Sequence, residues 1–329
     1  MGYILLFTMT YFHEATGLFL IISPGARQVA MGSAFTGVAD DFTAVYYNTG
    51  GIAFCKEVDI GVMYSPWLPG LFPGMNYIYT GGVVPVGTAS FGVGWSYFTT
   101  GKMVAMDESG KESGSWDIYD YALIFSYGEK VAKTLGIGVS LKYIYSFLYP
   151  DWFIRRAPYK NIKGSDATFA IDYGVLYKAA IPGLSIGISH QNLCSDGLCF
   201  VKYGISYPIP TLIRVGVGFD ATLLFRKQLP EFVSDVEILG DLVRDLVGDR
   251  HENWYGAGVE VGLKGKVLLR GGYFCDERDR REGVTYGGGV VFRSFQLDIA
   301  SDADIYEFPT SNWRVQINFK PAHFMKKDD

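Results

Sequence analysis

The sequence predicts an all-β protein: a transmembrane, antiparallel, up-and-down β-barrel of about fourteen strands with an N-terminal hatch inside it. Three observations predict this fold class. Large apolar residues alternate with small or polar ones, connections alternate between short and long, and the composition is rich in glycine and aromatic residues. The 329 residues include 41 Gly, 23 Tyr and 23 Phe, and only 19% are charged, against roughly 25% in a soluble domain.

Residues 1–15 are predicted to be a secretory signal peptide. Tyr3 to Phe12 form a largely apolar stretch, and the cut is expected near Ala15. A buried N-terminal strand and a short anchor helix are the alternatives for this segment. The remaining chain divides into a hatch over residues 16–54, a barrel over 55–320 and a polar tail over 321–329.

The strands are predicted from alternation with a period of two. From Leu135 to Ser146, large apolar residues alternate with Gly, Ser and Lys, and similar runs begin at Ile213, Tyr255 and Trp313. Such alternation indicates strands, because a helix would scatter the two faces. The fourteen predicted strands are 56–65, 75–86, 88–99, 116–127, 134–147, 165–178, 184–192, 210–223, 233–241, 253–263, 266–275, 283–292, 295–303 and 312–320.

The small or polar face of these strands is predicted to line a lumen. In a soluble sandwich the repeated glycines would lie on the outer face, where they weaken a strand and pack against nothing. In an outer-membrane barrel the apolar face meets lipid and the other face points inward. The location predicted from this pattern is the bacterial outer membrane, with its lipid as a partner.

Loop lengths favour the same architecture. The connections after odd-numbered strands are long or charged (66–74, 100–115, 148–164, 193–209, 242–252, 276–282 and 304–311), whereas those after even-numbered strands are mostly short, such as Gly87, 264–265 and 293–294. Short turns that alternate with long loops are typical of up-and-down outer-membrane barrels. Residues 225–249 depart from the pattern because Leu239, Leu242, Val243 and Leu246 are spaced more like a helix, and the strand at 233–241 is placed there to keep the number even.

Residues 16–54 do not alternate and are predicted to be a compact irregular segment with one short helix. A wall with so many inward glycines cannot fill its own lumen, so either another segment occupies the lumen or it is a water channel. We expect the N-terminal segment to be the plug. The inward glycines are Gly92, Gly94, Gly136, Gly138, Gly216, Gly218, Gly256, Gly258, Gly287 and Gly289.

The N-terminal segment resembles the opening signature of the PorV/PorQ family of outer-membrane barrels, within the FadL-like superfamily. The matching residues include Arg27, Met31, Gly32, Asp40, Asp41, Tyr47 and Asn48, and strands near the C-terminus are similar as well. The resemblance implies a fourteen-stranded barrel with a hatch and a role in type IX secretion. Secreted cargo proteins and subunits of the secretion machinery would then be partners.

Charged residues on the inward face are the best candidates for a site. They are Asp59, Lys142, Asp172, Arg214, Glu260, Arg270, Asp298 and Arg314. Buried charges need partners, so one interpretation is a set of ion pairs that braces the barrel against the hatch through Arg27, Asp40 and Asp41. A polar conduit is the alternative.

The sequence contains no clear pattern of a catalytic, metal, cofactor or nucleic-acid site, so we expect no enzyme, cofactor, metal site or nucleic-acid partner. The four histidines are far apart without metal-ligand spacing, and the glycine-rich strands do not precede a helix as a dinucleotide site requires. No basic tract indicates nucleic-acid binding. Cys194 and Cys199 flank a four-residue turn that could carry a hairpin disulfide in an oxidising envelope.

Two functions therefore remain. The first is surface display of cargo proteins in type IX secretion, by protein recognition at the outward loops. The second is passive transport of hydrophobic small molecules in the manner of FadL-like barrels. The second would require apolar inward positions, of which the clearest strands offer only Met63, Ile144 and Leu176.

Overall fold

The computed structural model describes residues 16–69, 74–156, 161–202, 204–247, 253–276, 281–302, 304–305 and 312–321. The predicted signal peptide, and all of the predicted tail except Pro321, lie outside the described residues.

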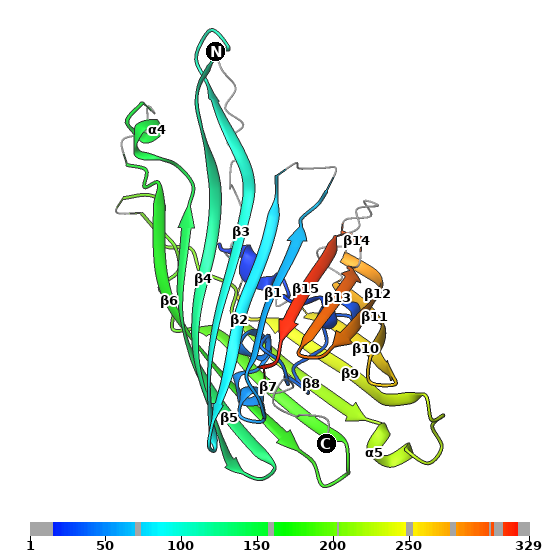
Figure 1. Ribbon diagram of the computed structural model, residues 1–329. Helices are drawn as coiled ribbons and strands as arrows, with labels where there is room; N and C mark the ends of the chain where they lie inside the picture. Colours follow the sequence, from blue (N-terminus) through cyan, green and yellow to red (C-terminus); the bar gives the residue numbers. More distant parts are fainter. Residues whose placement is uncertain are drawn as a thin grey trace.

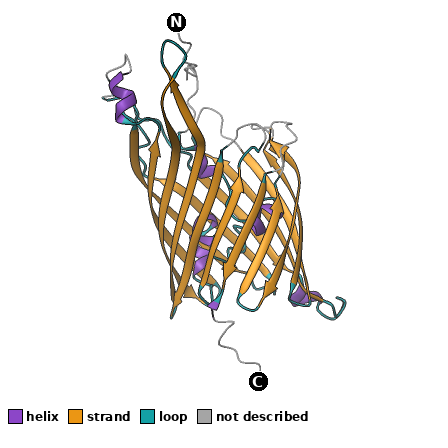
Figure 2. Ribbon diagram, turned by 45° about the horizontal axis from the view of Figure 1, so that its top comes forward, coloured by secondary structure: helices purple, strands orange, loops and turns teal. Residues whose placement is uncertain are grey.

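The strands form one closed antiparallel barrel (Figures 1 and 2). Neighbours along the chain pair with each other, and the ring closes where β1 pairs with β15, with Ile60 opposite Phe319. The two-residue β14 pairs only with β12 at the rim, so fourteen of the fifteen described strands make the barrel, as predicted. The strands are β1 (Asp59–Pro66), β2 (Asn76–Val86), β3 (Ala89–Met106), β4 (Glu112–Ala132), β5 (Leu135–Phe147), β6 (Ser165–Lys178), β7 (Leu184–Leu193), β8 (Leu212–Asp220), β9 (Val233–Asp245), β10 (Asn253–Leu263), β11 (Val267–Asp276), β12 (Arg281–Phe292), β13 (Phe295–Ser301), β14 (Asp304–Ile305) and β15 (Trp313–Phe319).

The outer face of the barrel is apolar and the inner face is buried. Along β5, Val139 is 47% exposed while its neighbour Ser140 is 2% exposed. The same alternation places large apolar side chains outward around the ring, where a bilayer would solvate them. A closed barrel leaves no unpaired strand edge in lipid. The protein is therefore an outer-membrane β-barrel. In the described part of the chain, no helix is long and apolar enough to cross a membrane.

Short turns gather at one end of the barrel and long connections at the other (Figure 2). We call these the short-turn end and the long-loop end. The predicted loop 100–115 is instead mostly strand, because β3 and β4 continue past their neighbours as a hairpin that projects from the long-loop end (Figure 1). The short helix α4 (Asp151–Arg156) lies in the next long connection.

The irregular region before residue 249 contains a full strand. Helix α5 (Thr222–Phe225) precedes it, and β9 then runs from Val233 to Asp245. The predicted strand is confirmed and is longer than expected. Leu239 and Val243 point into the lumen, whereas Leu242 points to lipid. Apolar residues therefore occupy both faces of this strand, and their spacing resembles that of a helix.

The N-terminal segment passes through the barrel from one end to the other (Figure 1). At the long-loop end, the Thr16 backbone N–H donates to the Pro208 carbonyl at 2.7 Å, and at the short-turn end the chain enters β1 at Asp59. It contains four short helices rather than one: η1 (Leu18–Ile21), α1 (Ala26–Ala30), α2 (Ala44–Tyr47) and α3 (Thr49–Ile52). We call residues 16–54 the hatch.

The wall glycines allow the hatch backbone to lie directly against the strands. A Cβ at Gly138 would be 2.5 Å from the Thr49 carbonyl carbon, and one at Gly258 would be 2.5 Å from the Met31 Cα. Any side chain at these positions would push the hatch away from the wall. The glycines thus serve close packing, which is one of the recognised uses of glycine within a strand.

Candidate functional site

The lumen has two levels that differ in what lines the wall. Toward the short-turn end the inward positions are mostly glycines, against which hatch residues pack. Toward the long-loop end many inward positions carry large apolar or aromatic side chains, interspersed with buried polar and charged residues such as Asp245, Asp276 and Arg314. The large apolar and aromatic side chains that are buried at this second level are Met63, Tyr77, Tyr79, Phe98, Ile124 and Ile144 on β1–β5, and Leu212, Val243, Trp254 and Phe274 on β8–β11.

This apolar lining corrects the expectation from sequence, which named only Met63, Ile144 and Leu176. Most of the missed residues lie in the inward register, two or four positions from an inward glycine. Trp254 precedes Gly256 on β10, and Phe274 follows Gly272 on β11. Extending the glycine register to the end of each strand would have found most of them, but not Val243, because β9 has no inward glycine. Ile21 of the hatch packs against this group on β8–β11.

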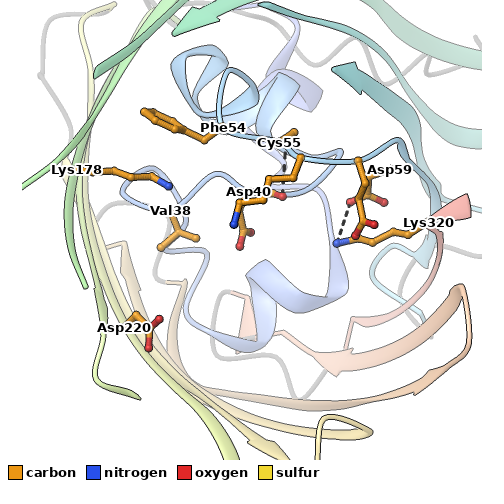
Figure 3. Close-up of a pocket in the computed structure, with 10 residues that line it drawn as sticks. Val38, Asp40, Phe54, Cys55, Asp59, Lys178, Asp220 and Lys320 are labelled. Atoms are coloured by element: carbon orange, nitrogen blue, oxygen red, sulfur yellow. Dashed lines mark hydrogen bonds and ion pairs between the residues drawn. The ribbon is translucent and has the colours of Figure 1, made fainter. Parts of the chain in front are cut away.

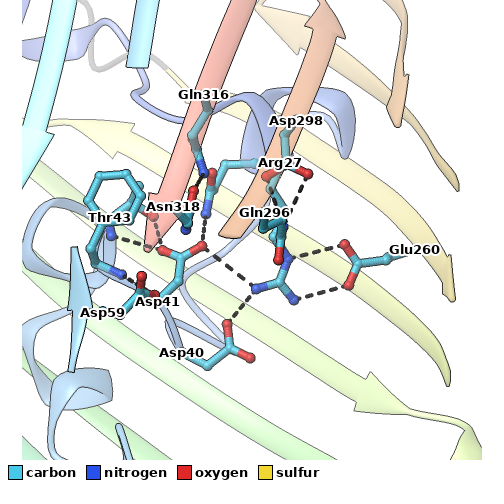
Figure 4. A network of polar contacts seen from close by, with 12 residues as sticks. Arg27, Asp40, Asp41, Thr43, Asp59, Glu260, Gln296, Asp298, Gln316 and Asn318 are labelled. Carbon is cyan, nitrogen blue, oxygen red and sulfur yellow. Dashed lines mark hydrogen bonds and ion pairs between the residues drawn. The ribbon is translucent and has the colours of Figure 1, made fainter. Parts of the chain in front are cut away.

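Arg27 on α1 is the centre of a buried polar network (Figure 4). Its guanidinium lies 2.6 Å from an Asp40 carboxylate oxygen and 3.7 Å from one of Asp41, both within the hatch. It also reaches the wall, at 2.8 Å from Glu237 on β9 and 3.2 Å from Glu260 on β10. One side chain thereby ties two parts of the hatch to two strands.

The two hatch aspartates have different surroundings. Burial would raise the pKa of Asp40, but the charges of Arg27 and Lys320 and the hydrogen bonds of the carboxyl together outweigh it, so the net shift of this pKa is downward. Asp41 is almost fully buried and is held by neutral donors, with Gln28 Nε2 at 2.7 Å and the Thr43 hydroxyl at 2.6 Å. Burial raises the pKa of the Asp41 carboxyl. Asp40 therefore carries the charge that Arg27 requires.

Most of the predicted lumen charges are joined in pairs. Arg270 lies 2.5 Å from Glu260 and 2.6 Å from Asp298. Lys142 and Asp172 are 2.8 Å apart and both are buried. Two further pairs, Arg314 with Asp302 at 2.7 Å and Asp59 with Lys320 at 3.6 Å, involve partners that the sequence did not single out. This arrangement is a set of braces between strands and hatch, and it leaves no continuous row of free charges.

Arg214 differs from the other lumen charges. It is fully buried, and within the described part of the chain no carboxylate lies within ion-pair distance of it. Its guanidinium instead packs over the Tyr46 and Tyr47 rings, 5.3 and 5.4 Å from their centroids, and donates to Gln191 Oε1 at 3.1 Å. Aromatic faces and an amide oxygen thus replace a counter-ion here.

The other residues of the hatch signature have structural contacts. The Gly32 N–H donates to the Thr285 hydroxyl at 3.0 Å, and Tyr47 donates its hydroxyl proton to the Pro24 carbonyl at 2.9 Å. The Asn48 side-chain amide donates to the Thr36 and Val175 carbonyls at 2.9 and 3.0 Å. These contacts fold the hatch on itself and fix it to β6 and β12. Met31 packs against the glycine wall of β10.

A cavity of about 380 Å³ lies beside the hatch at the short-turn end (Figure 3). Its lining combines hatch residues with the ends of β1, β6, β8 and the residue after β15. Cys55 lies at its edge, and burial together with the nearby carboxylates of Asp40 and Asp41 raises the pKa of this thiol. Cys55 is therefore held as a neutral thiol. The lining residues are Val38, Asp40, Phe54, Cys55, Lys56, Glu57, Asp59, Lys178, Asp220 and Lys320.

Cys194 and Cys199 are free thiols, so the predicted disulfide is not formed in this structure. Between them, Leu198 pairs with Tyr207 across the long connection. Cys199 Sγ then lies 3.0 Å from the Val201 carbonyl, while Cys194 is exposed. The segment between the two cysteines is thus a bridge to another part of the loop and does not form the tight turn that the spacing suggested. No group of acidic, His or Cys residues in the described ranges is arranged to hold a metal.

Comparisons with known proteins bear on the fold. No protein-family profile and no curated protein sequence matches the chain. Among solved structures, the Pseudomonas putida toluene transporter TodX is similar with a TM-score of 0.59 and 12% identity, over 90% of this chain and 96% of that one. The chain has the fold of a FadL-like barrel.

Two further structures agree with this result. The monoaromatic hydrocarbon channel CymD is similar with a TM-score of 0.55, and a Pseudomonas aeruginosa FadL homologue with 0.53, each at 12% identity and over 90% of this chain. The coverage is 97% and 98% of those two chains. TodX is described as a transporter and CymD as a channel, and none of these three structures is described as a member of the PorV/PorQ family.

Proposed function

We propose that the protein is a passive outer-membrane channel for hydrophobic small molecules. The observation that carries this proposal is the apolar lining of the lumen on the long-loop side of the glycine level. Leu212, Val243, Trp254 and Phe274 lie together on four adjacent strands. These side chains are at most 6% exposed, and Ile21 of the hatch packs against them. A solute must therefore displace the hatch there, and it then gains roughly 25 cal/mol for each Å² of apolar area that becomes buried.

The comparisons support the same class of solute. TodX and CymD share the fold and are channels for toluene and for monoaromatic hydrocarbons. The ion pairs of Arg27 and Arg270 lie at the glycine level, whereas Arg314 pairs with Asp302 nearer the long-loop end. An uncharged apolar molecule would meet aromatic and aliphatic side chains first.

Uptake measurements test the proposal. The protein is produced in a bacterial host that lacks a hydrophobic channel of its own, and entry of radiolabelled toluene is followed. We expect faster entry than with an empty vector, and Val243→Asp should abolish the gain because it places a carboxylate in the apolar lining. Val243→Leu is the matched control and should keep it. Heat-modifiable migration in gels checks that each barrel is folded, and entry at the empty-vector rate with a folded wild-type barrel would refute the channel.

Surface display in type IX secretion is the second candidate. It rests on the resemblance of residues 25–51 and on the projecting β3–β4 hairpin, where Met103 and Met106 are 44% and 62% exposed. The structural comparisons favour the channel. Shortening the hairpin should abolish surface display of a cargo protein without affecting toluene entry if this second function is correct, and unchanged display would argue against it.

A further inference from the structure

Three lysines without a carboxylate partner surround the mouth of the lumen at the short-turn end. Lys178 is the last residue of β6, Lys130 lies near the end of β4, and Lys56 is between the hatch and β1. In the described part of the chain, none of them forms an ion pair. The barrel therefore presents unneutralised positive charge at this mouth.

Two of these lysines converge on one aromatic ring. The Lys178 Nζ is 4.3 Å from the centroid of the Phe54 ring, and the Lys130 Nζ is 5.6 Å from it. Lys178 lines the cavity. Lys130 is not part of the lining but lies on the inward register of β4, opposite Gly136, which faces the hatch, and it reaches the Phe54 ring of the lining. The ring attracts each ammonium group, so their positions are restricted before any ligand arrives.

The carboxylates that line the same cavity are already engaged (Figure 3). Asp40 is held by Arg27 at 2.6 Å, and Lys320 is beside Asp59 at 3.6 Å. Asp220 accepts the Thr222 backbone N–H at 2.9 Å, and Glu57 also has a partner. Asp40 and Asp59 are thus paired with other cations, and the two remaining carboxylates, Asp220 and Glu57, are fewer than the three lysines Lys56, Lys130 and Lys178.

We propose that this mouth binds a small oxyanion, with its carboxylate or phosphate group between the ammonium groups of Lys56, Lys130 and Lys178. An anion there would relieve the mutual repulsion of the three cations and form charge-assisted hydrogen bonds with them. The cavity of about 380 Å³ admits a small organic anion, whose apolar part would contact Val38 and Phe54. In outer-membrane barrels the short turns face the periplasm, so the anion is exchanged with that compartment. The proposal does not depend on the transport function.

Calorimetric titration of the full-length protein in a non-ionic detergent, at low ionic strength, tests it. Benzoate, inorganic phosphate and uncharged benzyl alcohol are the probes. We expect at least one anion to bind and benzyl alcohol not to. Lys178→Gln should weaken anion binding roughly five- to tenfold, because it removes one of three cations.

The matched control is Lys133→Gln, which removes an exposed lysine from the β4–β5 turn and should leave binding unchanged. Stronger binding of benzoate than of phosphate would identify an organic carboxylate as the ligand class, and the reverse would identify a phosphate group. The site is refuted if neither anion binds, if benzyl alcohol binds as tightly as benzoate, or if Lys133→Gln has the same effect as Lys178→Gln.

Discussion

At the scale of single residues, buried charges hold the lumen together only as pairs. Lys142 and Asp172 face each other at 2.8 Å with almost no exposure. Replacing Lys142 with Met would leave a buried carboxylate without a counter-ion, which typically costs about 3–5 kcal/mol. We expect this loss in the free energy of unfolding, measured in urea with the protein in lipid vesicles.

The double variant Lys142→Met with Asp172→Asn is the control. It removes both charges, so it should be more stable than the Lys142→Met single variant. If the loss of unfolding free energy in the double variant equalled the sum of the losses in the Lys142→Met and Asp172→Asn single variants, the two residues would not be acting as a pair.

On the lipid-facing side of the barrel, a charge is costly because no partner or water is available there. Val139→Arg would put a charge in hydrocarbon and should cost about 2–4 kcal/mol near the midplane, whereas Val139→Leu should cost little. Equal unfolding free energies for the two variants would mean that Val139 does not face lipid. Ser140→Arg should be costly as well, because Ser140 is buried on the inner face and its hydroxyl lies 2.8 Å from that of Ser126.

At the scale of elements, the glycine contacts decide how the hatch is seated. Gly138→Ala would place a methyl group against Thr49, and overpacking of this kind costs about 1–3 kcal/mol. We expect trypsin to cleave after the buried Arg27 roughly tenfold faster in this variant, because the hatch is loosened. Gly271→Ala is the matched control, since a Cβ there meets nothing within 4 Å, and its cleavage rate should equal that of the wild type.

The projecting hairpin reports the orientation of the barrel. Lys111 is exposed at the tip of β3–β4, and Lys133 is exposed in the short β4–β5 turn. If the long loops face the cell exterior, trypsin added to intact cells should cleave after Lys111 and spare Lys133. Cleavage confined to Lys133 would invert the orientation.

The sequence predicted most strands of the barrel because each strand separates a lipid face from a lumen face, so apolar residues recur with a period of two. β9 is the exception, because apolar residues occupy both of its faces and its strand was placed only to keep the number even. The sequence also predicted that the N-terminal segment lies inside the barrel, because the wall glycines leave room for another chain, and residues of this segment do pack against those glycines. It did not predict which side chains meet. Arg27 contacts residues more than two hundred positions away in the sequence. A local sequence pattern cannot predict contacts between residues so far apart in the chain.

At the scale of the whole molecule, the barrel and the hatch are separable. No hatch residue contributes to the strand ladder, which closes through β1 and β15 and through β11 and β12. Deleting residues 26–52 should therefore leave a folded barrel and turn it into an ion-conducting pore in a planar bilayer. Wild-type protein should be nearly silent under the same conditions. A silent deletion variant would show that loops or side chains fill the lumen instead.

The path of the hatch also constrains the order of assembly. On one side of the β1–β15 seam, the Phe42 backbone N–H bonds to Asp59 of β1 at 3.2 Å, and on the other the Ala26 N–H bonds to Gln316 of β15 at 2.9 Å. The hatch therefore spans the two strands that are farthest apart in the sequence and that must find each other last. Bringing such distant segments together is the slow step in forming long-range pairings. Because the hatch bonds to both strands, we expect it to shorten this search, so a chain without it should still close but should fold more slowly.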